Sequence, residues 1–145
     1  MAQFYFSLEK VLRWRSLELA AEQAKLEQLI REQLRLQTLR ADLSAEKSKL
    51  DRSLDSLPDL RGADLRAVSA YRLRLKRQAD HLAELVVKCD RDISEQKKRY
   101  RAAKQRFRLL EELRSRKFEE WRLEQARQLE SLATESYLAI WNREQ

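Results

Sequence analysis

The stretch DSLPDLRGADL, residues 55–65, contains the only proline and the only glycine of the chain, Pro58 and Gly62. Proline breaks a helix interior and glycine weakens one, so both residues favour an interruption between helices. Globular domains have about 7% glycine and 5% proline, which supply their many turns. A chain of 145 residues with one of each is therefore predicted to have a single turn, at about 58–63, between two long helices.

Apolar residues recur at alternating steps of four and three residues on both sides of this stretch. These positions form one apolar row, or seam, on each predicted helix. Ten of the fifteen positions in the seam before residues 55–65 are leucine, and twelve of the fifteen positions in the seam after them are apolar. A repeat of 3.5 residues is typical of coiled coils. We therefore predict an all-α fold, a single antiparallel two-helix coiled-coil hairpin over 1–145. Its first helix spans about 7–57, and its longer C-terminal helix spans about 64–142.

The hairpin also has a predicted register. If Leu57 faces Leu65, the expected neighbours are Leu43 and Ala79, Leu36 and Val86, Leu29 and Ile93, Leu12 and Leu110, and Phe4 and Phe118. Gly62 is expected to adopt the left-handed conformation that a reversal often needs, and Asp59 or Asp64 to cap the second helix. Because such a seam is narrow, we expect no concave pocket of the kind that binds small molecules.

The inventory of reactive residues disfavours catalysis. One histidine and one cysteine cannot build the usual zinc sites, and one glycine cannot build a phosphate-binding loop. Carboxylates on an exposed helix lack the shifted pKa values of catalytic pairs. We therefore predict no enzyme, no metal, no cofactor and no small-molecule substrate. Cys89 is interpreted as a small buried apolar residue, and His81 as a residue flanking the seam.

Targeting signals are not evident in the sequence. No apolar run approaches the roughly 20 residues of a membrane span. The opening MAQFYFSLEK has no cationic start followed by an apolar core, as a signal peptide would. We therefore expect a soluble, cytoplasmic protein.

Positive charge is concentrated in one segment. Residues 97–117 contain ten basic and two acidic residues, a net charge of +8 in a chain whose total is +7. Such a field should attract an acidic partner. Nucleic acid is disfavoured because Glu111 and Glu112 interrupt the run, and because Tyr100 and Phe107 lie on the seam, where they cannot stack on bases. A protein partner is favoured, and a merely solvated basic face remains the alternative.

The second helix outlasts the first. After about Trp121 it has no predicted partner helix, yet an apolar stripe continues at spacings of three and four. We interpret this stripe as a partner-binding face, with fold-back or self-association as alternatives. Its candidate residues are Leu129, Ala133, Tyr137 and Ile140, preceded on the same stripe by Leu123 and Ala126.

The opening FYFSLEKVLRWRSLE resembles the start of FliJ-type flagellar export proteins, with an aromatic–x–aromatic pair, Leu-Glu, and then an apolar residue, leucine and arginine. The matching residues are Phe4, Phe6, Leu8, Glu9, Val11, Leu12 and Arg15. AYRLRLKRQADHL resembles that family's start of the second helix, and RYRAAKQRFRLLEELRSRKFEEWRLE its late basic helix. The ending LATESYLAIWNREQ matches more loosely, because Thr134-Glu135 stands where the family often has Asp-Glu.

This resemblance implies a non-enzymatic stalk of the flagellar type III export apparatus, similar to part of a rotary ATPase gamma subunit. Its partners would be a hexameric export ATPase, an export-gate membrane protein and export chaperones. The candidate ATPase-binding residues are Lys97, Arg101, Lys104, Arg108 and Arg116, and the candidate export-gate contacts are Tyr71, Leu75 and Gln78. The alternatives are the stalk of a virulence type III system, a generic coiled-coil tether, or a basic nucleic-acid-binding rod.

Overall fold

The computed structural model describes residues 2–56 and 61–145. The described chain is all-helical, with α1 at Glu9–Asp55, α2 at Gly62–Glu144 and no strand in these two ranges. The two helices pack together within two compact units. The central unit is Ala21–Arg101, and the terminal unit combines the residues up to Ala20 with Ala102–Gln145.

Helix α1 starts two residues later than predicted. Residues 2–6 are not helical, and the Leu12 N–H donates to the Leu8 carbonyl at 2.8 Å. Glu9 and Arg52 lie in the first and last turns, where their charges are favourable for the helix dipole. The predicted end at Leu57 lies outside the described residues.

Helix α2 starts at Gly62, two residues before the predicted start at 64. The Leu65 N–H donates to the Arg61 carbonyl at 3.0 Å, so the first helical turn already includes the glycine. Gly62 has no positive φ, and the prediction of a left-handed glycine is therefore wrong. Asp64 lies in the first turn, as a favourable charge near the helix N-terminus. The predicted roles of Pro58 and Asp59 fall outside the described residues.

The central unit has an apolar seam where the prediction placed it. Leu36, Cys89 and Ile93 form its buried cluster. The half-buried residues packed against this cluster are Leu26, Leu29, Leu82, Leu85 and Val86. The cluster thus brings together both predicted pairs from this region, Leu36 with Val86 and Leu29 with Ile93.

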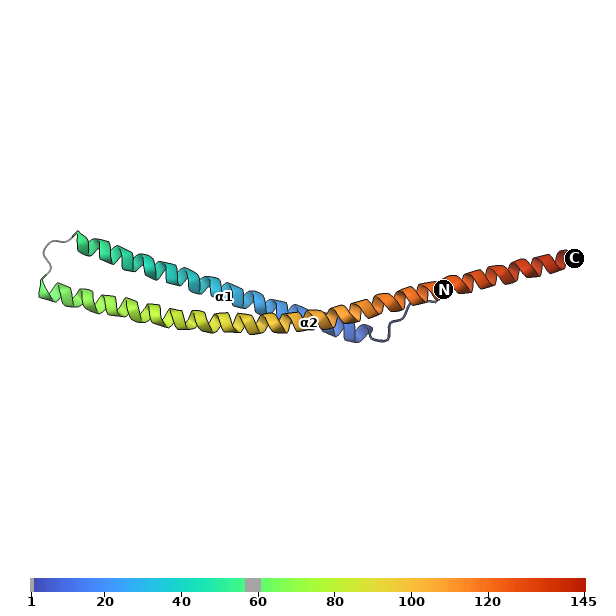
Figure 1. Cartoon of the computed structure of the whole chain (residues 1–145), viewed down its shortest axis with the longest axis horizontal. Helices are drawn as coiled ribbons and strands as arrows, with labels where there is room; N and C mark the ends of the chain where they lie inside the picture. The colour runs from blue at the N-terminus through green and yellow to red at the C-terminus, as the bar shows by residue number, and fades with distance from the viewer. Residues whose placement is uncertain (1, 57–60) are drawn as a thin grey trace. The chain divides into compact units, whose positions relative to one another are not determined.

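Polar contacts across the central unit show that its two helical segments are antiparallel. The Gln96 amide donates to the Glu22 backbone carbonyl at 3.0 Å, and the Gln33 amide donates to the Asp90 carboxylate at 2.9 Å. Nearer the predicted turn, Arg72 pairs with Asp51 at 3.0 Å. The partner's number falls as the α1 number rises, and Figure 1 shows these parts of α1 and α2 side by side.

The terminal unit also packs its parts of the two helices antiparallel. Glu18 pairs with Arg106, and Glu9 pairs with Arg114, each at 3.0 Å. The ring centroids of Phe4 and Phe118 are 5.2 Å apart, which confirms the predicted neighbours. The helices therefore keep nearly the predicted register within this unit as well.

Candidate partner-binding surfaces

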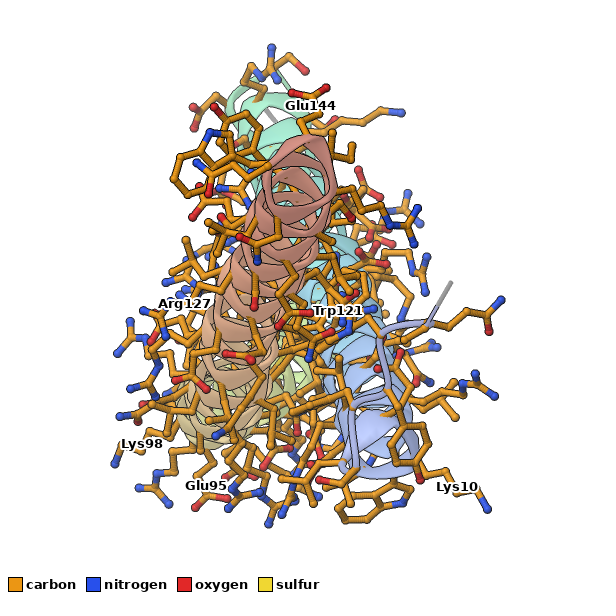
Figure 2. The ribbon with its side chains drawn as sticks, turned by 90° about the vertical axis from the view of Figure 1, so that its right-hand side faces the viewer. Lys10, Glu95, Lys98, Trp121, Arg127 and Glu144 are labelled. Carbon is orange, nitrogen blue, oxygen red and sulfur yellow. The ribbon has the colours of Figure 1, made fainter. Side chains whose placement is uncertain are left out.

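The structure exposes most of the candidate ATPase-binding residues. Lys97 and Arg101 are exposed in the central unit, and Arg108 and Arg116 are exposed in the terminal unit. Figure 2 shows the neighbouring Lys98 extending away from the ribbon. Lys104 is half-buried rather than fully exposed, because it lies beside the buried seam residue Ala103. Its charge is therefore less accessible to a partner than the other four.

Two further arginines of the basic segment already pair with α1. Arg106 bonds to the Glu18 carboxylate, which also accepts a bond from Arg15 at 2.9 Å. The bond from Arg15, and then the two nearby guanidinium charges, hold the pKa of Glu18 below its ordinary value of 4.5. Arg114 pairs with Glu9 in the same way. Part of the positive charge of 97–117 therefore helps to hold the helices together.

An aromatic cluster fixes the segment that precedes α1. Phe4 packs edge-on against Phe118, and its ring centroid lies 5.9 Å from that of Trp121. The Arg114 guanidinium lies 5.5 Å from the Phe4 ring centroid. Phe6 is buried, whereas Tyr5 between them is 84% exposed. The aromatic–x–aromatic pattern thus places two rings against the protein and one in solvent.

The three candidate export-gate contacts have different environments. The Tyr71 hydroxyl donates to the Glu46 carboxylate, and this bond raises the pKa of Tyr71 above its ordinary value. Leu75 is only 5% exposed, because it packs in the seam between the helices. Gln78 is exposed and lies beside Leu73 and His81 in a shallow hollow. A partner at this surface would reach Tyr71 and Gln78 more readily than Leu75.

A groove in the central unit corrects the prediction that the seam has no concave pocket. It has a volume of ≈ 880 Å³. Its lining comes from both helices: Arg40, Leu43, Ser44, Lys47, Asp51, Asp55, Arg72, Leu75, Lys76, Ala79 and Asp80. Leu43 and Ala79, a predicted pair, both line it. Among the seam positions that line it, Ala79 has a small side chain, and Arg40, Lys47 and Arg72 have charged heads that reach water, so apolar side chains do not fill this part of the seam.

The C-terminal stripe is exposed in the terminal unit. Leu129 is 68% exposed, Tyr137 69% and Ile140 58%, and Ala133 is also exposed. Leu132 and Trp141 lie next to the stripe and are exposed too, although the four-residue interpretation did not include them. Leu132 lies three residues after Leu129, and Trp141 lies four residues after Tyr137. This helical spacing in the sequence could have identified both as neighbours of the stripe.

A second exposed apolar patch was not predicted. Val11, Trp14 and Leu17 lie at successive steps of three on α1, and Trp14 is 56% exposed. The Arg15 guanidinium lies 4.5 Å from the centroid of the Trp14 ring. Lys10, on the same helix, points away from the ribbon in Figure 2. In the sequence, these residues were interpreted only as part of the opening that resembles FliJ-type proteins.

The remaining reactive group is the single cysteine. Cys89 is 6% exposed, and its thiol lies 3.7 Å from the Leu29 carbonyl. Burial, followed by the nearby carboxylates, raises the pKa of this thiol, which disfavours the reactive thiolate. Within residues 2–56 and 61–145, no group of three or more histidine, cysteine, aspartate or glutamate side chains is suited to a metal ion. None of the helices described is both long and apolar enough to span a bilayer.

Comparisons with protein-family models, with curated proteins and with solved structures return no match for this chain.

Proposed function

We propose that this chain is a non-enzymatic stalk of a flagellar type III export apparatus. It forms one antiparallel coiled-coil hairpin with a longer C-terminal helix. It binds the hexameric export ATPase in the cytoplasm and links it to the export gate and to export chaperones.

The observation that carries this proposal is the contact between the family-like opening and the family-like late helix. Phe4 packs on Phe118 and Trp121, and Glu9 pairs with Arg114. These residues belong to the two longest segments that resemble FliJ-type proteins. Their mutual contact gives the two resembling segments a joint structural role, as expected if both belong to one stalk fold.

A stalk of this kind would act on its ATPase without chemistry of its own. A single two-helix rod inside a six-membered ring cannot contact all six subunits alike. It therefore makes the subunits inequivalent, and it shifts their nucleotide-binding conformations if its contacts differ between those conformations. Exposed basic residues would capture an acidic ring, because charge complementarity mainly accelerates association.

The export-gate contact is proposed for the central unit. Tyr71 and Gln78 offer a polar surface, and the nearby groove offers Leu43 and Leu75 beneath charged rims. An extended segment of the gate protein with alternating apolar and charged side chains would fit this groove. Leu75, which is only 5% exposed, would be reached through this groove.

The test is ATP hydrolysis by a candidate export ATPase with and without the full chain. Two charge-reversal variants divide the basic residues by unit, Lys97→Glu with Arg101→Glu and Arg108→Glu with Arg116→Glu. Lys104 is left unchanged because it is half-buried. We expect the wild type to stimulate hydrolysis and the Arg108/Arg116 variant to lose most of that stimulation at moderate salt, since the end bearing the termini enters the ring.

A matched control reverses two exposed arginines elsewhere, Arg66→Glu with Arg77→Glu, and should retain stimulation. Circular dichroism of each variant checks that helicity is unchanged. Absence of stimulation by the wild type with both flagellar and virulence export ATPases would leave a generic tether as the better interpretation. Stimulation of a virulence ATPase alone would assign the chain to that system instead.

A further inference from the structure

The exposed C-terminal stripe has a symmetric spacing. Its members Ala126, Leu129, Ala133, Tyr137 and Ile140 follow steps of three, four, four and three residues. The sequence of steps is therefore the same in both directions from Ala133. In the described part of the terminal unit these side chains remain exposed to solvent.

This symmetry matches a two-fold contact between identical helices. In a two-fold interface, the same patch serves both copies, and each pair of contacts occurs twice. With the axis at Ala133, Leu129 of one copy meets Tyr137 of the other. Ala126 likewise meets Ile140, and Ala133 meets Ala133 of the other copy. Alanine at the centre lets the two backbones approach closely.

Charges around the stripe fit the antiparallel arrangement. The same axis places Arg122 opposite Glu144, once at each end of the contact. No two residues of like charge lie opposite each other between 122 and 144. Arg122 now pairs with Glu119 on its own helix at 2.9 Å. Both side chains of that pair are largely exposed, and exposed ion pairs contribute little to stability. Exchanging it for the Arg122–Glu144 pair of the dimer therefore costs little free energy.

A parallel contact would be electrostatically worse. Residues on the contact face would then meet their own counterparts, so that Arg122 would meet Arg122 and Glu144 would meet Glu144. Like charges that meet across an interface are destabilising. The contact covers residues 122–144, or about 35 Å of helix. An interface of this small size is typical of weak, reversible association.

We propose that this stripe is the interface of an antiparallel, two-fold symmetric homodimer. The occupant of the exposed face is thus the same face of a second copy. This inference does not depend on the export function, because it rests only on the spacing, exposure and charges of α2. If the stripe also binds another protein, dimerisation and that binding exclude each other.

The first experiment measures association of the full chain by sedimentation equilibrium over a range of micromolar concentrations. Arg122→Glu and Glu144→Arg should each weaken self-association by about tenfold, because attraction becomes repulsion at both ends. Mixing the two variants should restore it, since each mixed pair again has opposite charges at both ends. The control Arg127→Glu, whose position faces Ala139, should leave association unchanged.

The second experiment measures orientation with spin labels on cysteines placed at Thr134 or Asn142, in a Cys89→Ala background. In the antiparallel dimer, two labels at 134 are offset by about 3 Å along the helix axis, and two at 142 by about 27 Å. A parallel dimer would have no axial offset at either position, so the two distances would differ only through the directions in which the two side chains leave the helix. Helicity of the labelled chains is checked by circular dichroism.

The proposal is overturned by any of three results. One is a chain that remains monomeric at the highest concentration tested, which would fit fold-back of the stripe or a different partner. Another is association that the variant mixture does not restore. The third is a label distance at position 142 without the axial offset of the antiparallel arrangement.

Discussion

Two stretches of α2 have the same kind of apolar spacing and opposite surroundings. In the central unit, Leu75, Cys89 and Ile93 are 5–7% exposed. In the terminal unit, Leu129 and Tyr137 are 68% and 69% exposed. The first stretch has α1 packed along it, whereas the second extends beyond the last contact with the N-terminal segment. Helical periodicity therefore defines which face is apolar, and the presence of a partner defines whether that face is buried.

The largest expected effect comes from truncating the same residue type in both environments. Leu36→Ala should lower the free energy of unfolding by about 2–5 kcal/mol, because it leaves a cavity beside Cys89 and Ile93. Leu129→Ala should change it by less than about 0.5 kcal/mol at concentrations low enough for the chain to be monomeric. Urea denaturation followed by circular dichroism measures both. Equal effects would show that the C-terminal stripe is buried in solution.

A buried polar residue provides the next test. Gln96 is 5% exposed and bonds to both the backbone carbonyl and the carboxylate of Glu22. Gln96→Leu should destabilise the chain by about 1–3 kcal/mol, because the Glu22 groups lose their donor. The exposed Gln128→Leu serves as its control and should have little effect.

Replacing both partners of this bond should reverse the loss. The double variant Glu22→Leu with Gln96→Leu leaves no unsatisfied polar side chain, so its stability should return to that of the wild type or exceed it. A double variant as unstable as Gln96→Leu alone would show that the bond contributes little.

A smaller effect is expected at the start of α2. Gly62→Ala should stabilise the chain by about 0.5–1 kcal/mol, since the residue is helical and alanine restricts the unfolded chain. A Cβ there meets no atom within 4 Å. Thermal unfolding monitored by circular dichroism measures the change. A destabilised variant would mean that Gly62 needs a conformation that alanine cannot adopt.

The smallest effect concerns pH. The folded-state pKa of Glu18 is lowered, so its contribution to stability is present above the ordinary value of 4.5 and is lost as the pH falls towards the folded-state pKa. The Glu18→Gln variant should therefore lose less stability than the wild type as the pH falls below that ordinary value. Glu124→Gln, which removes a single exposed ion pair of 3.9 Å with Arg127, serves as the control and should have a smaller effect. Melting temperatures measured from neutral pH down to pH 3 compare the two variants.

Much of the fold was predictable from the sequence because coiled-coil packing is local and periodic. The buried residues Leu36, Cys89, Ile93 and Ala103 all lie at predicted seam positions. Phe4 lies beside Phe118 as the register required. The conformation of Gly62 was not predictable, because a glycine between two helices can end a turn or begin a helix.

The candidate surfaces were predictable only in part. The exposed positions of Lys97, Arg101, Arg108 and Arg116 followed from their places off the seam. The burial of Leu75 followed from its place on the predicted seam, although resemblance also made it a candidate contact. The half-burial of Lys104 did not follow, because the basic candidates were chosen by charge and by resemblance rather than by distance from the partner helix. The groove between Arg40 and Arg72 was likewise missed.

The sequence by itself determined two long helices, an interruption near Pro58 and Gly62, the apolar face of each helix and a concentrated positive charge. Each of these properties depends on residues close together in the chain. Only the tertiary structure decided which side chains are covered, which arginines are paired with α1 and where the seam opens into a groove. These features depend on the distance between residues of two different helices, such as Gln96 and Glu22, and the spacing along either helix alone does not fix that distance.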